Sequence, residues 1–285
     1  MGRTAVIADS TCDLSKELLE RYGVSIVPLH IILGDKEYRD TVEITPPKIY
    51  EWADANKTTP KTSAVSVEDV SIALEKAMET ADEAVCFCIS ESMSSTGEVM
   101  RMTAKEMGIE DKVFVIDSQN LSTGIGLQVI EAAEMAAAGM GGAEIVGQIE
   151  KIRPQVRASF VVDTLMYLYR GGRCSGLSAM AGSALKLHPV ITVKDGAMGA
   201  GKKYRGRLEK VIMAYVEDLM PQIEKARPAR VFITHSGCDD AIVAKVRERL
   251  EQLDYFDEIL VTVAGGVVSS HCGPGTLGVL FIAQE

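Results

Sequence analysis

The sequence lacks the features that mark several large classes of protein. Only 5% of its 285 residues are aromatic, no apolar run reaches the roughly 20 residues that cross a bilayer, and the first residues contain no apolar signal-peptide core. Its six cysteines occur without CxxC spacing, so we expect reduced thiols, no metal site and a cytoplasmic protein. Because 40 acidic residues outnumber 30 basic ones, the broad basic surface that binds nucleic acid is not expected.

The sequence does contain enough apolar residues to fill a sizeable hydrophobic core. Apolar residues make up 47% of the chain, and its length favours two domains. In the first half, short strand-like runs alternate with helical ones, which is typical of an α/β fold with a largely parallel sheet. The expected strands are 4–8, 24–33, 84–89 and 113–116, and the expected helices are 14–22, 46–55, 67–81, 99–107, 126–139 and 143–152.

The second half mixes strands and helices differently. We predict strands at 158–162, 230–234, 259–263 and 278–283, a hairpin at 190–198, and helices at 164–169, 177–187, 208–225 and 239–253. Pro154 opens this part of the chain. We therefore expect an N-terminal α/β domain over 1–155 and a C-terminal α+β domain over 156–285, with residues near 60–80 able to pack against the second domain.

One of the four histidines, His271, precedes a glycine-dense segment near the C-terminus. The spacing of Gly273, Gly275 and Gly278 matches the dinucleotide-binding fingerprint, which requires a following helix within a βαβ unit of about thirty residues. Only seven residues follow Gly278, so that interpretation fails. Two remain: a loop whose backbone N–H groups hold an anion beside His271 as a donor, or a plain surface turn.

Two other segments are rich in hydroxyl groups. Ser66 with Asp69 matches the N-cap of a helix, which leaves Thr62 and Ser63 as better ligand candidates. Residues 90–97 contain four serines and a threonine before a helix, among them Ser94 and Ser95. A helix N-terminus with hydroxyl groups suits a carboxylate or phosphate, although a loop of turn-forming residues is the simpler alternative.

Basic residues are concentrated in two short segments, 169–173 and 202–207. The guanidinium groups suit a phosphate or an acidic partner surface, and a solvated face is the alternative. The arginines concerned are Arg170, Arg173, Arg205 and Arg207.

Nucleophilic catalysis is weakly indicated. Ser94 and His271 are the obvious pair, but no serine lies in a G-x-S-x-G motif. His30 and His188 have apolar neighbours and are expected to be core histidines with satisfied hydrogen bonds, while His235 is expected to be a structural or turn residue after a strand.

Several short motifs, in order along nearly the whole chain, resemble the DegV family. Asp9-Ser10-Thr11-Cys12-Asp13-Leu14 is similar to the family's D-S-T-A-D-L, and 62–66 resembles T-S-x-P-S with Val65 in place of proline. Gly171-Gly172-Arg173 and Gly273-Pro274-Gly275 also fit. Segment 93–97 departs from the family's L-S-G-T-Y, because Ser95 replaces glycine and Gly97 replaces tyrosine.

The resemblance implies a two-domain DegV-like (EDD) fold and a lipid-binding rather than catalytic role. Members of the family include the fatty-acid-binding subunits (FakB) of bacterial fatty acid kinase. By this resemblance, Thr62, Ser94 and His271, with Ser63 and Ser95 beside them, surround the carboxylate of a long-chain fatty acid, which is the only ligand expected in place of a cofactor or metal.

The resemblance also implies a partner. A separate fatty acid kinase subunit converts the bound carboxylate to an acyl phosphate, and the four arginines are candidates for docking it or holding the phosphate. The small residues of 177–185 and the thirteen methionines suit an apolar tunnel. The alternatives are an acyl or phosphoryl hydrolase using Ser94 and His271, and a phosphotransfer component with a nucleophilic histidine.

Overall fold

The first sheet of the computed structural model, which describes residues 2–175 and 187–284, is entirely parallel. Its strand order is β2-β1-β6-β7, and β1 pairs with β6 from Thr4 opposite Glu83 to Ala8 opposite Phe87. The expected α/β fold with a parallel sheet is confirmed. The strands are β1 (Thr4–Asp9), β2 (Val24–Val27), β6 (Glu83–Cys88) and β7 (Val113–Asp117).

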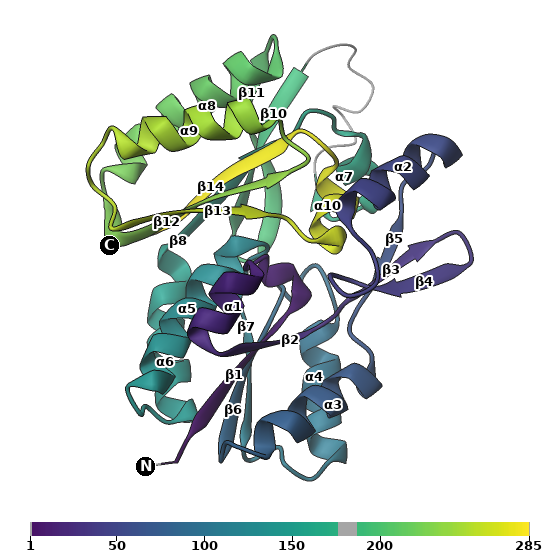
Figure 1. Ribbon diagram of the computed structural model, residues 1–285, viewed down its shortest axis with the longest axis vertical. Coiled ribbons are helices and arrows are strands. Elements are labelled where there is room, and N and C mark those ends of the chain that lie inside the picture. Colours follow the sequence, from purple (N-terminus) through teal and green to yellow (C-terminus); the bar gives the residue numbers. More distant parts are fainter. Residues whose placement is uncertain (1, 176–186, 285) are drawn as a thin grey trace.

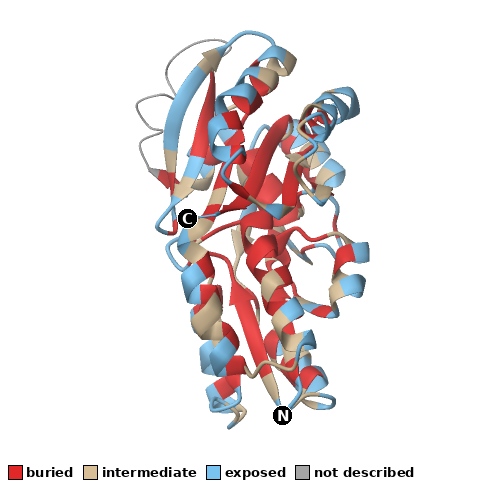
Figure 2. Ribbon diagram, turned by 90° about the vertical axis from the view of Figure 1, so that its left-hand side faces the viewer, coloured by how far each residue is buried: buried red, intermediate tan, exposed pale blue. Residues whose placement is uncertain are grey.

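Helices cover both faces of this sheet (Figure 1). Alternation along β1 explains why, since Val6 and Ala8 enter one apolar core while Ile7 enters another. One face carries α1 (Lys16–Tyr22), α5 (Thr123–Ala137) and α6 (Gly142–Ile152), and the other carries α3 (Val67–Met78) and α4 (Thr96–Glu106). In Figure 2 the buried strands lie between helices whose outer faces are exposed.

The second sheet is mixed and has seven strands in the order β13-β12-β14-β8-β10-β11-β9. Helices α8 (Leu208–Ile223) and α9 (Asp240–Glu251) cover its outer face, and α5 contacts β8 and β14 on the inner one. The strands are β8 (Val156–Val161), β9 (Cys174–Ser175), β10 (Leu187–Lys194), β11 (Ala197–Arg205), β12 (Ala226–Ser236), β13 (Glu258–Val263) and β14 (Thr276–Ala283). The short helices η1 (Ser10–Cys12) and η2 (Arg153–Gln155) follow β1 and α6.

A third, three-stranded antiparallel sheet was not expected from the sequence. It consists of β3 (His30–Leu33), β4 (Lys36–Arg39) and β5 (Lys61–Ser63), in the order β4-β3-β5. The single strand predicted over 24–33 is wrong, because the chain leaves the first sheet at Pro28, which has no N–H for a sheet ladder. The backbone N–H of Leu29 donates instead to Ser10 Oγ at 3.1 Å.

Helix α10 (Gly266–Cys272) contacts β3 and β5 of this small sheet, and α2 (Pro46–Asn56) and α7 (Met166–Gly171) pack against α10. The loop or surface turn expected around His271 is wrong for this residue, because His271 lies in the last helical turn of α10. The apolar helix predicted over 177–187 and the tunnel wall expected from 177–185 lie largely or wholly outside the described residues. The first sheet ends at Asp117 and the second begins at Val156, and a domain boundary near 155 stays a prediction.

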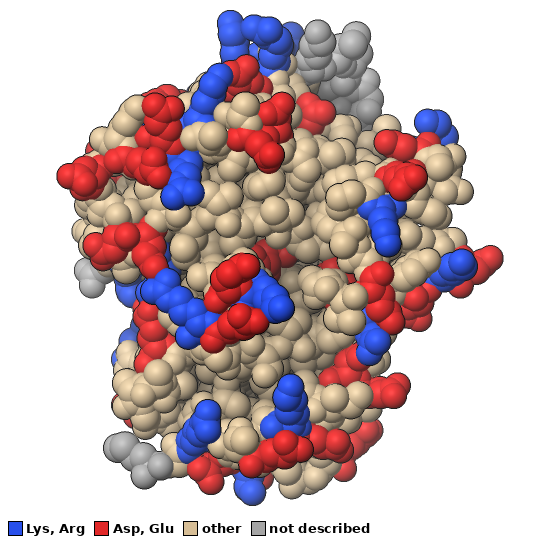
Figure 3. Space-filling view, in the orientation of Figure 1, with Lys and Arg blue, Asp and Glu red and all other residues tan. Residues whose placement is uncertain are grey.

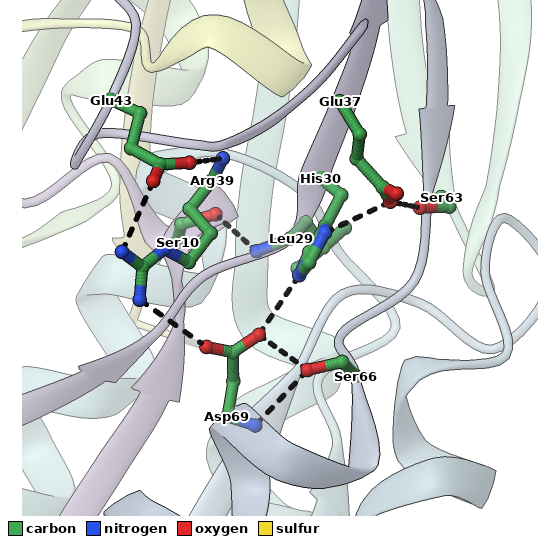
Figure 4. A network of polar contacts seen from close by, with 9 residues as sticks. All are labelled: Ser10, Leu29, His30, Glu37, Arg39, Glu43, Ser63, Ser66 and Asp69. Atoms are coloured by element: carbon green, nitrogen blue, oxygen red, sulfur yellow. Dashed lines mark hydrogen bonds and ion pairs between the residues drawn. The ribbon is translucent and has the colours of Figure 1, made fainter.

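A polar network fastens the small sheet to α3 (Figure 4). His30 contacts Glu37 Oε1 through Nδ1 and Asp69 Oδ2 through Nε2, both at 2.9 Å. Ser66 caps α3, as expected, by accepting a hydrogen bond from the backbone N–H of Asp69 at 3.0 Å. The core position expected for His30 is therefore wrong, because charged partners hold it at the margin of the fold. His188 is buried as expected and contacts two backbone carbonyls.

Candidate functional site

A cavity of about 320 Å³ lies where β5, α10 and the loop between β6 and α4 meet. All five residues predicted to surround a carboxylate line it, namely Thr62, Ser63, Ser94, Ser95 and His271. The remaining lining is mostly apolar and includes Leu29, Ile89, Met93, Leu121, Met198 and Val268. The cavity therefore combines a group of polar side chains, called its polar end below, with apolar walls, in the size range of small-ligand sites.

Thr62 and His271 are joined directly at the polar end. Thr62 Oγ1 lies 2.8 Å from His271 Nε2. Strand β5 brings Thr62 to this position by pairing with β3, in which Ile31 lies opposite Thr62. The other ring nitrogen of His271, Nδ1, is buried and has no hydrogen-bond partner among the described residues.

The state of His271 follows from its surroundings. Burial, with a smaller contribution from the positive charge of Arg173, lowers the pKa of the imidazole to about 4, so the ring is neutral at neutral pH and carries one hydrogen. A hydrogen on Nδ1 would be a buried donor without an acceptor, which would lower the stability of the folded protein. We therefore assign the hydrogen to Nε2, which donates to Thr62 Oγ1 and leaves the Thr62 hydroxyl hydrogen free to reach a ligand.

Gly171 fixes the ring from the other side. A Cβ atom at residue 171 would lie 2.2 Å from His271 Nδ1, so only glycine allows α7 to approach the imidazole this closely. This contact also explains why Nδ1 is buried. The next residue, Gly172, ends α7 in the left-handed region with φ of 67°.

Ser94 and Ser95 lie between β6 and the start of α4. Ser94 Oγ is 3.0 Å from Thr96 Oγ1 and accepts a hydrogen bond from the backbone N–H of Thr96 at 3.3 Å. Ser95 is the N-cap of α4, but its side chain makes no capping bond. Both residues thus lie at a helix N-terminus, whose partial positive charge favours an anion.

The four candidate arginines are all exposed, and the structure does not gather them at the cavity. Arg173 lines it and donates from Nη1 to the carbonyl oxygen of Gly171 at 2.7 Å. Arg170 belongs to α7, Arg205 ends β11, and Arg207 is the N-cap of α8. On the face drawn in Figure 3, acidic and basic side chains are interspersed and leave wide areas with neither.

Helix α10 is held at its start by two buried carboxylates that sequence reasoning did not identify as such. The backbone N–H of Gly265 donates to Asp13 Oδ1, and that of Gly266 donates to Asp40 Oδ1, both at 2.7 Å. Asp13 also accepts from Ser122 Oγ at 2.5 Å. Asp13 belongs to the Asp9 to Leu14 motif that resembles the family's D-S-T-A-D-L, but the motif did not indicate this role.

Among residues 2–175 and 187–284, no basic side chain forms an ion pair with Asp13, Asp40 or the nearby Asp9. Burial is the largest effect on each, and it raises the pKa of Asp13 to about 8, that of Asp9 to about 6, and that of Asp40 above its ordinary value. Asp9 accepts the backbone N–H of Ile89 at 2.6 Å. Since Ile89 lines the cavity, the cluster fixes two walls of the site, α10 and the end of β6.

A smaller hollow of about 20 Å³ continues inward from the cavity. Leu121, Val268 and Cys272 line both spaces. His235 lines the inner hollow and belongs to β12, so of the two expected roles, structural or turn residue, the turn does not apply. Burial lowers the pKa of His235.

Ser94 and His271 are not arranged as a nucleophile and its base. The hydrogen-bond partner of Ser94 Oγ is Thr96, and that of His271 Nε2 is Thr62. Within residues 2–175 and 187–284, no acid orients His271 through Nδ1. No group of three or more His, Cys, Asp or Glu side chains in the described parts of the chain is placed to hold a metal ion.

A search for membrane spans among the described helices found none that is both long and apolar enough to cross a bilayer.

Comparisons with known proteins agree on one family. The profile described as "Uncharacterised protein, DegV family" matches residues 3–284. A DegV domain-containing protein of Deinococcus radiodurans is 35% identical over 277 residues, covering 96% of each chain. Protein DegV of Bacillus subtilis is 28% identical over 276 residues, covering 96% of this chain and 97% of that protein.

Solved structures share the fold over nearly the full length. A DegV family protein from Thermus thermophilus, described by its fatty acid binding, has a TM-score of 0.89 at 33% identity, covering 99% of each chain. A stearic acid-binding protein from Eubacterium ventriosum has a TM-score of 0.83 at 29% identity, covering 99% of this chain and 98% of that one. The α/β architecture, the motifs and these likenesses agree, and the chain belongs to the DegV family.

Proposed function

We propose that this protein binds a long-chain fatty acid and holds its carboxylate between Thr62 and Ser94. The observation that carries the proposal is the cavity itself, in which the hydroxyl groups of Thr62 and Ser94 and the imidazole of His271 line an otherwise mostly apolar space. The fatty acid binding named for the Thermus structure and the stearic acid named for the Eubacterium structure support the same ligand class.

The donors suit an anion that enters a desolvated site. A carboxylate accepts several hydrogen bonds, and the Thr62 and Ser94 hydroxyl groups supply donors without burying a permanent cation. His271 acts through Thr62, because its Nε2–H occupies one lone pair of Thr62 Oγ1 and turns the hydroxyl hydrogen toward the ligand. Arg173, exposed at the rim of the cavity, adds long-range attraction for the anion.

The acyl chain supplies most of the binding free energy. Burying one methylene is worth about 0.8 kcal/mol, so a long chain offers on the order of 10 kcal/mol before the costs of ordering. Methionines such as Met93 and Met198 line the walls, and their flexible side chains adapt to different chain shapes.

The proposal extends to a kinase partner that acts on the bound fatty acid. A separate fatty acid kinase subunit is proposed to convert the bound carboxylate to an acyl phosphate, with Arg170, Arg173, Arg205 and Arg207 docking that partner or steadying the phosphate. Exposed guanidinium groups are available for bidentate contacts. Arg205→Ala is expected to leave fatty acid binding unchanged while lowering acyl phosphate formation by an added kinase subunit.

Intrinsic hydrolysis is the second candidate and is less well supported. A Ser94 nucleophile needs a base within hydrogen-bond reach, whereas His271 Nε2 is engaged by Thr62. Protein incubated with a chromogenic acyl ester is expected to show no turnover that depends on Ser94. The wild-type protein and Ser94→Ala should therefore give the same rate. Action in the cytoplasm stays a prediction.

A direct binding titration tests the proposal. Delipidated protein is titrated with palmitate in a calorimeter, and one saturable site per chain is expected. Ser94→Ala should weaken it, whereas Ser92→Ala, in the same loop but outside the cavity lining, should not. A protein that takes up neither palmitate nor oleate contradicts the proposal.

A further inference from the structure

A second cavity, of about 610 Å³, lies apart from the carboxylate site. Five parts of the chain form it: the loop after β7, the segment from η2 into β8, the hairpin β10–β11, helix α8 and the strand β14. Among the described residues, none that lines the first cavity also lines this one. Nothing in the fatty acid proposal uses it.

Its walls carry more basic than acidic groups, in a chain of net charge −10. The four cations are Arg153, Arg157, Lys194 and Lys202, against Asp195 and Asp218. Asp218 is already occupied, because it accepts from both Lys202 and the hydroxyl of Tyr204. Three cations then face one remaining carboxylate, that of Asp195.

Two of these cations are held in place by backbone oxygens. Arg153 donates from Nη1 to the carbonyl of Asp117 at 3.0 Å, and Arg157 donates from Nη1 to the carbonyl of Pro154 at 2.8 Å. Carbonyl oxygens orient a guanidinium group without neutralising it. In the part of the chain that the structure describes, neither arginine nor Lys194 forms an ion pair, so their charge is available to an anion.

The rest of the lining combines uncharged polar residues, among them Gln119, Asn120 and Gln222, with a set of apolar side chains. Val156, Val190, Val193, Leu219 and Phe281 contribute from β8, β10, α8 and β14. Tyr204 adds a half-buried ring whose hydroxyl is fixed by Asp218. An apolar floor under a cationic rim is complementary to a molecule with an apolar body and one anionic group.

We propose that this cavity is a second binding site, for an organic anion with an apolar body, held by Lys194, Arg157 and Arg153. The site does not require the first cavity to be filled, because the two share no lining residue.

Anilinonaphthalene sulfonate, an aryl sulfonate whose fluorescence rises in apolar surroundings, is the probe. It is titrated into protein loaded with palmitate, and one saturable site per chain is expected. Lys194→Gln with Arg157→Gln should weaken that binding by about tenfold, because charge-assisted contacts to the sulfonate are lost. The uncharged analogue N-phenylnaphthylamine should bind at least about tenfold more weakly than the sulfonate for the same reason.

Two controls separate this site from the first. Lys203→Gln removes a charge from β11 beside the lining residue Lys202 but outside the cavity lining, and should leave the affinity unchanged. Repeating the titration on protein without palmitate should also leave the affinity of this site unchanged, because the two cavities share no lining residue. Lys194→Gln by itself changes an exposed side chain, so loss of folding does not confuse the result. The proposal is overturned if no saturable site is found. It is also overturned if Lys194→Gln with Arg157→Gln leaves the binding unchanged, or if Lys203→Gln weakens the binding equally.

Discussion

His271 Nε2 lies 2.8 Å from Thr62 Oγ1, although 209 positions separate the two residues in the chain. One belongs to the last turn of α10 and the other to β5. The contact brings a neutral imidazole and a hydroxyl group to the polar end of the cavity. The account of the carboxylate site depends on this pair.

Thr62→Val keeps the shape of the side chain but removes the hydroxyl group. Palmitate affinity should fall by about tenfold or more, because a hydrogen bond to a charged group is worth about 1.5–3 kcal/mol. Isothermal titration of delipidated protein measures the change. Thr58→Val is the matched control, since Thr58 is exposed and lies outside the cavity lining; equal losses in both variants would contradict the role of Thr62.

Gly171→Ala should displace the imidazole of His271, because the new Cβ would lie 2.2 Å from Nδ1. The contact between His271 and Thr62 is then lost, and fatty acid affinity should drop toward that of His271→Ala. Gly147→Ala provides the control, as a Cβ at that position in α6 meets no atom within 4 Å. Unaltered affinity in Gly171→Ala would show that the ring does not need its present position.

Asp13 makes stability depend on pH in an unusual direction. Burial raises its pKa from 3.8 to about 8, so the folded protein binds more protons than the unfolded chain between these values. The free energy of unfolding must therefore fall as pH rises through this window, and the raised pKa of Asp9, about 6, acts in the same sense. Stability contributed in this way is complete below about pH 4 and is lost by about pH 8.

Urea unfolding at several pH values between 5 and 9 measures this dependence. Asp13→Asn removes the titrating group and should flatten the decline, while Asp35→Asn, an exposed residue in the turn between β3 and β4, should not. A wild-type protein whose stability rises from pH 5 to 8 would contradict the buried, uncompensated carboxylate.

Leu121→Ala should join the cavity to the inner hollow, because Leu121 lines both. The bound acids should then shift toward longer acyl chains, at a cost of about 2–5 kcal/mol in stability from the lost packing. Chromatography of the extracted lipid reports the chain lengths. Leu121→Met, which conserves volume, is expected to retain the wild-type distribution of acyl chain lengths. If Leu121→Ala also leaves that distribution unchanged, the hollow is not part of the space that holds the acyl chain.

Local sequence patterns predicted much of the fold. The alternation of strand-like and helical runs predicted the parallel sheet. A hairpin was predicted at 190–198, and Asp195 and Gly196 form its turn with positive φ. The small sheet was missed because β4 reads Lys-Glu-Tyr-Arg and its pairing is set by contacts with distant parts of the chain. Helix α10 was missed since it is seven residues long and starts at glycine, and its start is fixed by Asp13 and Asp40 rather than by a local cap.

The candidate site was predictable in its members but not in its geometry. Thr62, Ser94 and His271 were found from hydroxyl-rich loops and family motifs, and all three line one cavity. The pairing of His271 with Thr62 instead of Ser94 depends on how β5 and α10 meet, which no local pattern encodes. The same is true of Gly171, whose close approach to His271 is a tertiary contact.

The most direct test of the central claim is native mass spectrometry of the purified protein, followed by extraction and identification of any lipid released. A complex of one chain with one long-chain fatty acid is predicted, with its occupancy reduced in Thr62→Val. A ligand-free wild-type chain that stays unliganded after incubation with palmitate and oleate would contradict the account.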